Sequence, residues 1–129
     1  MASILRVDTI TDASSSNSVA VSTVFGGSAK VWADVDMTGT AAPDDSFNVT
    51  GIVDNGTGDV TVTIASDMGN ATYACSGMCG AASSFDDESM AHIISRAAGT
   101  ARFGITDVHN AADAMDIDPC MFIIHGDLA

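Results

Sequence analysis

Two short runs of alternating apolar and polar residues flank a polar segment at residues 54–59. The Asn55-Gly56 pair tolerates positive φ angles, and Gly58 adds a second permissive position. Alternating β-branched residues on both sides of such a turn are typical of a hairpin. The pattern therefore predicts a β-hairpin over residues 46–64, whose apolar positions are Phe47, Val49, Ile52, Val60, Val62 and Ile64.

The same alternation recurs in other segments, each bounded by turn-forming residues. Residues 38–45 contain Pro43 and two aspartates, and residues 77–82 are rich in Gly and Ala, so both are predicted loops. Short strands separated by turns, without alternating helices, are typical of an antiparallel sandwich. We therefore expect an all-β protein, an antiparallel β-sandwich, with further strands at residues 30–37, 72–76, 101–108 and 120–125.

Residues 83–99 allow two interpretations. Asp86, Asp87 and Glu88 suit the first turn of a helix, and the apolar residues from Met90 to Ala97 fall at helical spacing before a glycine. The alternative is a short strand centred on residues 92–95. The residue pattern alone leaves both open.

The first 25 residues differ from the rest of the chain. Their apolar residues are few, and a Ser-rich stretch between them buries little surface, so the segment alone is expected to be mobile. We expect an extended N-terminal arm over residues 1–25, held by a neighbouring copy or a larger assembly, and a single β-sandwich domain over residues 26–129. The alternative is that the arm packs on its own domain. The predicted attachment residues of the arm are Ile4, Leu5, Val7 and Ile10.

The charge balance excludes some classes of partner. The chain has 17 acidic and 4 basic residues and a formal net charge of −13, so a phosphate backbone or an anionic bilayer would be repelled. No apolar run approaches the about 18 residues of a membrane span, and the N-terminus lacks the order of a signal peptide. We expect no nucleic-acid partner, no membrane insertion and assembly in a cytoplasm.

The three cysteines cannot form a complete disulfide framework, because their number is odd. In one strand, Cys75 and Cys79 would share a face but lie about 13 Å apart, at roughly 3.3 Å per residue. They could pair only if the segment between them turned. Free thiols are the simpler expectation for Cys75, Cys79 and Cys120.

No constellation of residues indicates catalysis. His92, His109 and His125 lack metal-ligand spacing, and no nucleophile elbow or phosphate-binding loop is present. Nothing singles out a pair of aspartates for glycoside cleavage. The oxygens of the predicted hairpin turn could chelate calcium, although a tight turn can satisfy them itself. We expect no enzyme activity, no catalytic residue, no cofactor and no metal; the calcium alternative concerns Asp54, Asn55, Thr57 and Asp59.

Several segments, taken in order, resemble a domain of tailed-bacteriophage tail-fibre and related virion proteins. The matching stretches cover nearly the whole chain, and residues 3–12 resemble the virion-proximal start of such fibres, most often in marine phages. The resemblance implies a structural β module without catalytic function, a homotrimer, and a strand rather than a helix at residues 90–98. The stretches are Val31-Trp32, residues 46–49, 54–62, 70–77, 101–105 and 122–126.

The arm runs almost directly into the globular domain, whereas a tail fibre usually has a shaft between the two. A compact knob on an arm also fits a capsid decoration, or cement, protein. We expect a virion protein, made in the host cytoplasm, that decorates and stabilises the capsid through its arm. Its partners would be its own copies and the major capsid protein or tail proteins. The alternative is a short tail fibre or tail-tip protein that contributes to binding of the host receptor.

Overall fold

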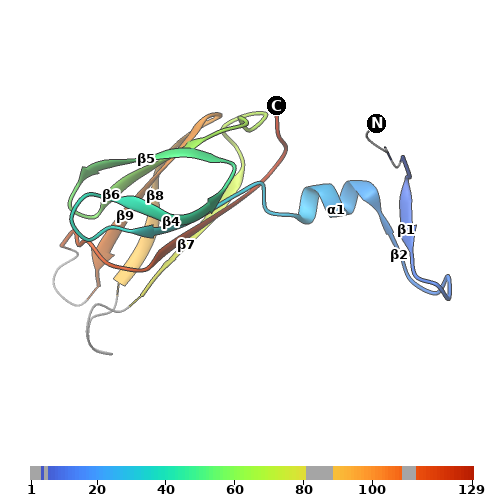
Figure 1. The fold of residues 1–129 in the computed structure, drawn as a ribbon, viewed down its shortest axis with the longest axis horizontal. Helices are drawn as coiled ribbons and strands as arrows, with labels where there is room; N and C mark the ends of the chain where they lie inside the picture. The colour runs from blue at the N-terminus through green and yellow to red at the C-terminus, as the bar shows by residue number, and fades with distance from the viewer. Residues whose placement is uncertain (1–3, 5, 81–88, 109–112) are drawn as a thin grey trace.

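The computed structural model describes residues 4, 6–80, 89–108 and 113–129. Two four-stranded antiparallel sheets pack face to face, which confirms the all-β sandwich (Figure 1). The first, called the β3 sheet, has the order β4 (Ala42–Phe47), β3 (Val31–Asp36), β10 (Cys120–His125) and β7 (Ala74–Cys79). The second, called the β9 sheet, has the order β5 (Val49–Gly56), β6 (Asp59–Ile64), β9 (Thr100–Asp107) and β8 (Ser89–Ala97).

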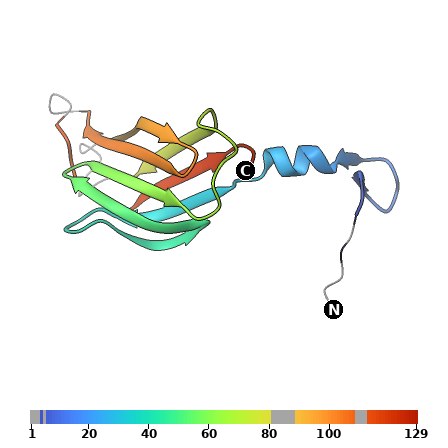
Figure 2. The same ribbon diagram turned by 90° about the horizontal axis from the view of Figure 1, so that it is seen from above.

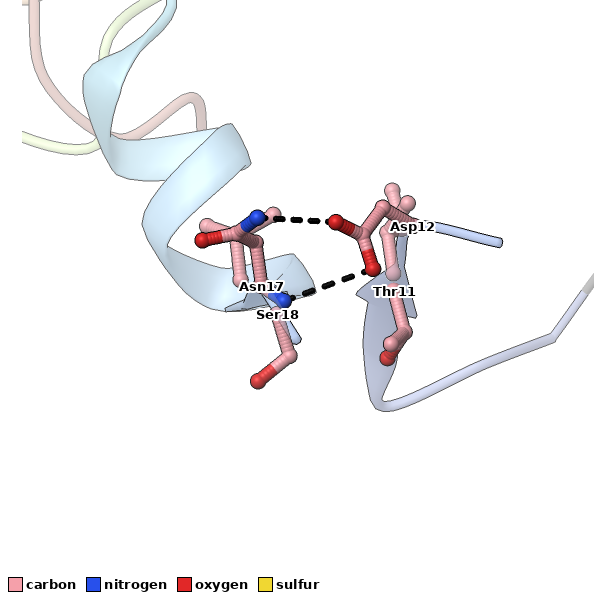
Figure 3. A pocket seen from close by; sticks show the side chains of 6 residues that line it. Thr11, Asp12, Asn17 and Ser18 are labelled. Atoms are coloured by element: carbon pink, nitrogen blue, oxygen red, sulfur yellow. Dashed lines mark hydrogen bonds between the residues drawn. The ribbon is translucent and has the colours of Figure 1, made fainter. Parts of the chain in front are cut away.

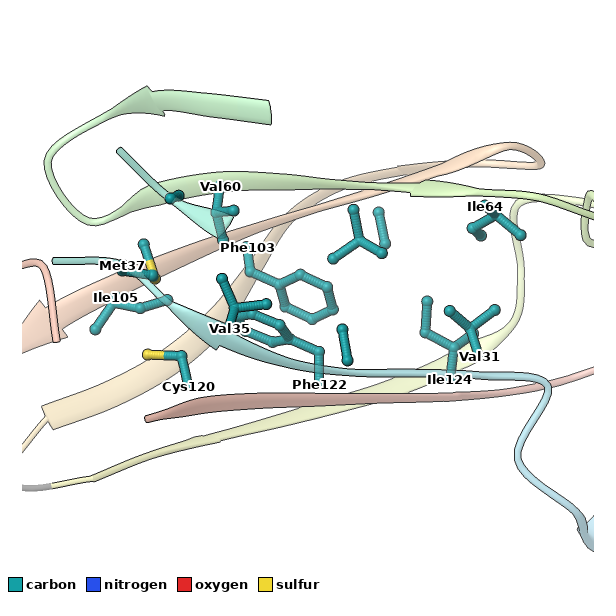
Figure 4. Close-up of a cluster of buried hydrophobic side chains, with 14 of the residues drawn as sticks. Val31, Val35, Met37, Val60, Ile64, Phe103, Ile105, Cys120, Phe122 and Ile124 are labelled. Carbon is teal, nitrogen blue, oxygen red and sulfur yellow. The ribbon is translucent and has the colours of Figure 1, made fainter. Parts of the chain in front are cut away.

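The core lies between the sheets and is built from alternate residues of the four central strands (Figure 4). Phe103 of β9 and Phe122 of β10 stack across it, with ring centroids 4.2 Å apart and an interplanar angle of 23°. The alternation that predicts strands in the sequence is therefore the alternation of buried and outward side chains. The buried positions on these strands are Val31, Ala33, Val35, Val60, Val62, Ile64, Ala101, Phe103, Ile105, Cys120, Phe122 and Ile124.

The predicted hairpin is confirmed over residues 49–64 as β5 and β6, with Ile52 opposite Val62. Its predicted first part is wrong, because Phe47 lies on β4 in the other sheet. Its tip is formed by Thr57 and Gly58 rather than by Asn55-Gly56, which belongs to β5. Gly58 has φ +65°, and a Cβ added there would lie 2.4 Å from the Ile105 carbonyl oxygen. Only glycine fits this tip without a steric clash.

One residue turns the chain from the first sheet into the second. Asn48, between β4 and β5, has φ +58°, a conformation that Asn tolerates better than most residues. Its side-chain oxygen accepts from Ser66 N (2.7 Å), and its amide donates to the Lys30 carbonyl oxygen (3.1 Å). Asn48 thus fixes the corner that joins the two layers.

Two loop predictions are wrong. Residues 42–45 belong to β4, and residues 77–79 belong to β7, which begins only at Ala74. Pro43 is compatible with β4 because this strand lies at the edge of its sheet, where a missing N–H breaks no ladder. A bulge opposite Asp34 and Val35 accommodates the extra residue Asp44.

The strand interpretation of the ambiguous segment is confirmed, because Ser89–Ala97 forms β8 and pairs with β9. A helix over these residues is wrong. Its predicted first turn, residues 86–88, lies outside the described residues. The segment forms a strand despite the helical spacing of its apolar residues, because pairing with β9 outweighs the local preference.

The N-terminal segment extends away from the sandwich (Figure 2). It contains a small hairpin, β1 (Thr9–Thr11) and β2 (Ser18–Ala20), followed by the helix α1 (Val21–Gly27). The arm is therefore more than a single extended segment, since it contains a helix that the sequence pattern did not predict. The helix has no side-chain N-cap and buries no residue, so its sequence carries few of the signals that predict a helix. Near the C-terminal end of α1, the Phe25 carbonyl oxygen accepts a hydrogen bond from Lys30 Nζ. A cation at this end also interacts favourably with the helix dipole.

The strand directions give the sandwich two distinct ends. The arm joins at the start of β3, and residues 126–129 lie near that end (Figure 1). The β5–β6 tip and the exposed turn at residues 38–40 lie at the opposite end. No helix in the described part of the chain is long and apolar enough to cross a membrane.

Candidate attachment site

The small hairpin of the arm is held together by one carboxylate. Asp12 accepts a hydrogen bond from Asn17 Nδ2 (2.8 Å; Figure 3). It also accepts from Ser16 N (3.0 Å) and Ser14 Oγ (3.0 Å). The hydrogen bond from the Asn17 side chain is the main reason that the pKa of Asp12 lies below its usual value. The arm therefore has a defined tip that needs no support from the sandwich.

The predicted attachment residues of the arm are exposed. Ile4 is 76% exposed, and Val7 and Ile10 are also largely open to solvent. Leu5 lies outside the described residues. Ile10 lines a shallow hollow beside Val19 on the small hairpin. The structure thus brings Ile10 beside Val19, but it does not bury any of the described attachment residues against the chain's own core.

Sequence reasoning missed two apolar residues of the arm, Val24 and Phe25. Both lie on α1 and are exposed, Phe25 by 64%. Because the helix itself was not predicted, nothing in the residue pattern assigned them to a common element. The arm therefore carries more unburied apolar surface than the four predicted residues supply.

A second exposed apolar surface lies on the sandwich, on the outer face of the β3 sheet. Phe47, Trp32 and Ile123 form one row across β4, β3 and β10, and Met121 lies opposite Met78 in the next row. All five are exposed, Met78 by 68% and Phe47 by 53%. We call Phe47, Trp32, Ile123, Met121 and Met78 the outer apolar patch. Contiguous exposed apolar side chains of this kind mark interaction surfaces.

The sequence contained one signal for this patch. Residues 120–124 are continuously apolar, although a strand with one solvated face normally alternates. Met121 and Ile123 therefore occupy outward positions where strict alternation would place polar residues. Two shallow hollows lie beside these residues. Trp32 and Asp34 help to line the first, and Met78 helps to line the second.

Carboxylates border the outer apolar patch. Asp34 lies opposite Asp45 in the same row as Met121, and one of its oxygens, Oδ1, is buried without a hydrogen-bond partner in the described structure. The pKa of Asp118 is raised, first by burial and then by the charges of nearby carboxylates, among them Asp36 and Asp44. This border therefore has a negative potential that favours a cationic group.

The residues of the calcium alternative use their oxygens within the protein. Asp54 accepts from Gly56 N (2.8 Å) and Ala41 N (3.1 Å). Asp59 forms an ion pair with Arg102, whose hydrogen bond lowers the pKa of Asp59. These contacts account for the carboxylates as turn and strand residues, and no group of three or more potential ligands for a metal forms among the residues that the structure describes.

The histidines are not brought together. His92 lies on β8 in the β9 sheet, whereas His125 ends β10 in the other sheet. His109 lies outside the described residues. Within the described chain these side chains suggest no shared catalytic site.

The three cysteines are free thiols. Cys75 and Cys79 share one face of β7, as their spacing predicts, but the close neighbour of Cys79 is Cys120 on β10, at an Sγ–Sγ distance of 3.0 Å. A hydrogen bond from Cys120 lowers the pKa of the Cys79 thiol, and the same contact together with burial raises the pKa of Cys120.

Comparisons of the chain with models of protein families, with curated proteins and with solved structures find no match.

Proposed function

We propose that the protein is a non-enzymatic structural protein of a tailed-phage virion, a β-sandwich that decorates and stabilises the capsid through its N-terminal arm. The observation that carries this proposal is the arm itself. It projects from the sandwich with Ile4, Val7, Ile10 and Phe25 exposed (Figure 2). Exposed apolar side chains on a projecting segment are available for burial on a partner.

Burial of these side chains on a neighbouring protein would supply the binding energy. Complete burial of an Ile, Val or Phe side chain contributes about 1.5–3 kcal/mol. The hydrogen bonds around Asp12 already order the tip of the arm, which lowers the entropy lost on binding. An arm of this kind suits a protein that must stay attached to a large particle.

The acidic composition fits a surface protein of a particle. With a net charge of −13, the outward surfaces of neighbouring particles repel one another, which limits aggregation. The particle is assembled in the host cytoplasm, and the partners in this proposal are the major capsid protein and other copies of the chain, arranged as homotrimers as the sequence resemblance implies.

The second candidate is a short tail fibre or tail-tip protein that helps to bind the host receptor. Residues 3–12 favour it, because they resemble the virion-proximal start of tail fibres. The two candidates differ in copy number, since capsid decoration needs hundreds of copies per particle and a tail needs far fewer.

Antibody-gold labelling of purified phage particles in the electron microscope tests the proposal. Label spread over the heads is the expected result. Label confined to the tail end would replace decoration by the tail-fibre candidate, and the absence of label from every particle would overturn the virion assignment. Quantitative mass spectrometry of the same particles provides the copy number and must agree with the labelling.

A further inference from the structure

We infer that the arm of one copy binds the outer face of the β3 sheet of a second copy, with Arg6 placed against Asp34 and Asp45. This inference deepens the proposed function, because it rests on the arm as the attachment element and names the surface that the arm binds. It concerns contacts between copies in solution, so it can be tested without the virion.

The outer apolar patch is an exposed surface, in the described part of the sandwich, whose members are brought together by the cross-strand register. Phe47, Trp32 and Ile123 are neighbours across three strands, and Met121 lies beside them. Directly opposed side chains on one face of a sheet lie about 4.5–5.5 Å apart at Cβ, so the row forms a continuous surface. An apolar segment bound to this surface would remove apolar side chains of both partners from water.

The carboxylates restrict the chemistry of that occupant. Asp34 and Asp45 share a row with Met121, and Asp34 Oδ1 is buried without a hydrogen-bond partner in the described structure. A buried acceptor of this kind is costly until a donor reaches it. Asp36, Asp44 and Asp118 lie close by, so the occupant must combine apolar side chains with a positive charge.

Three of the four basic residues of the chain are already engaged. Lys30 donates to the Phe25 carbonyl and to Ser28, and Arg102 pairs with Asp59. Arg96 donates to the Tyr73 carbonyl and lies over the ring of Tyr73. Within the described residues, Arg6 is exposed and has no such partner.

Arg6 lies in a segment with the required composition. Ile4 and Val7 beside it are exposed apolar residues, so the segment presents a cation between apolar side chains. The chain therefore carries both halves of a complementary contact: an apolar and cationic arm, and an apolar and acidic sheet face.

The geometry places the two halves on different copies. The helix α1 leads directly away from the start of β3, so the hairpin β1–β2, which follows Arg6 and Val7 in the chain, stands clear of the sandwich (Figure 2). An arm that points outward reaches a neighbour's sheet, not its own. Pro43 and the bulge in β4 interrupt the adjacent sheet edge, which favours binding across the face over pairing with that edge strand.

A contact between an arm and a different surface is head-to-tail. Repetition of such a contact produces a closed ring if the rotation between copies closes and an open chain if it does not. The homotrimer implied by the sequence resemblance corresponds to a ring of three copies, each of which lends its arm to the next.

Sedimentation velocity of the full chain over a wide range of concentration tests the inference. The wild type is expected to associate reversibly. Arg6→Glu and Asp45→Lys are each expected to weaken association about tenfold or more, because each places like charges together. The double variant Arg6→Glu/Asp45→Lys is expected to recover most of the lost association.

Matched controls separate this surface from general effects of charge and hydrophobicity. Met121→Ala is expected to weaken association, whereas Met90→Ala removes an even more exposed methionine on β8, 51% against 38%, and is expected to leave association unchanged. Asp113→Lys makes the same charge change as Asp45→Lys at an exposed site outside the sheets. Circular dichroism and thermal unfolding check that each variant is folded.

Three outcomes would overturn the inference: a wild type that stays monomeric at every concentration, association that Arg6→Glu does not weaken, and a charge-reversed double variant that does not recover. None of these outcomes bears on gold labelling of particles. The failure of this inference is therefore distinguishable from the failure of the virion proposal.

Discussion

Cys79 and Cys120 occupy a non-hydrogen-bonded pair of positions between β7 and β10. The assignment follows from their register and from the neighbouring bond, in which Gly80 N donates to the Pro119 carbonyl oxygen at 2.7 Å. Residues at such positions have Cα atoms about 4.5 Å apart, within the range that a disulfide bridges. The two thiols are therefore placed to be oxidised to a disulfide without movement of the strands.

We predict that hydrogen peroxide converts this pair to a disulfide. The Cys79 thiolate attacks one peroxide oxygen and hydroxide leaves; the Cys120 sulfur then attacks the resulting sulfenic acid, and its oxygen leaves as water. Because the pKa of Cys79 is lowered, the reaction is expected to become fast at a lower pH than for an ordinary thiol. Intact-mass and free-thiol assays at several pH values measure it.

Cysteine variants provide the controls for that oxidation. Cys75→Ser should still lose two thiols to oxidation, whereas Cys79→Ser and Cys120→Ser should yield no intramolecular disulfide. A bridge should stabilise the sandwich by about 2–4 kcal/mol. A peptide map that instead joins Cys75 to Cys79 would contradict the prediction.

The stacked pair Phe103 and Phe122 should dominate the stability of the core. We expect Phe103→Ala to lower the free energy of unfolding by about 3–5 kcal/mol, because it removes a fully buried ring and leaves a cavity. Urea titration followed by tryptophan fluorescence measures the change. Phe25→Ala, at an exposed position on the arm, is the matched control and should change stability by less than about 0.5 kcal/mol.

The hairpin tip should tolerate only glycine at its second position. Gly58→Ala is expected to destabilise the protein by about 1–3 kcal/mol, since a Cβ at φ +65° meets the Ile105 carbonyl oxygen. Gly26→Ala in α1, where a Cβ meets nothing within 4 Å, should instead be neutral or slightly stabilising. Equal melting temperatures for the two variants would show that the tip is not strained.

The ion pair between Asp59 and Arg102 should contribute a small stability that depends on pH. The pKa of Asp59 is lowered in the folded state, so its contribution is present above the usual aspartate pKa and is lost as pH falls through the lowered value. Asp59→Asn should therefore be less stable than the wild type at neutral pH and converge with it in acid. Arg102→Gln, which removes the same pair from the other side, should show the same convergence in urea titrations.

Removal of residues 2–24 should leave the sandwich folded, because α1 buries no residue and the buried core cluster begins only at Val31. We expect the melting temperature of the truncated chain to stay within a few degrees of the wild type. In the virion proposal, the same truncation abolishes incorporation into particles. Truncated protein that still assembles would place the anchor elsewhere.

The sequence predicted those parts of the fold that depend on local alternation. Val60, Val62 and Ile64 alternate with threonines because one face of β6 is buried, and that pattern is visible without a structure. The strand β4 was missed because Pro43 and its aspartates usually form loops, and only an edge position makes them acceptable in a strand. The helix α1 was missed because its composition of β-branched residues and glycines has low helix propensity.

The candidate site was predictable only in part. Ile4, Val7 and Ile10 were recognised because they are the apolar residues of a polar segment. The row of Phe47, Trp32 and Ile123 joins residues far apart in the chain, and its members meet only through the register of three strands. The contact of Cys79 with Cys120 has the same origin, so no spacing rule along the sequence could reveal it.

The opposed ends of the sandwich make the molecule directional. In the virion proposal the arm end faces the particle, while the exposed turn at residues 38–40 lies at the opposite end, separated from the arm by the full length of β3 (Figure 1). A peptide grafted into that turn would be presented to the medium rather than to the support. Under that proposal the fold would serve as a display platform, whose orientation follows from the direction of β3.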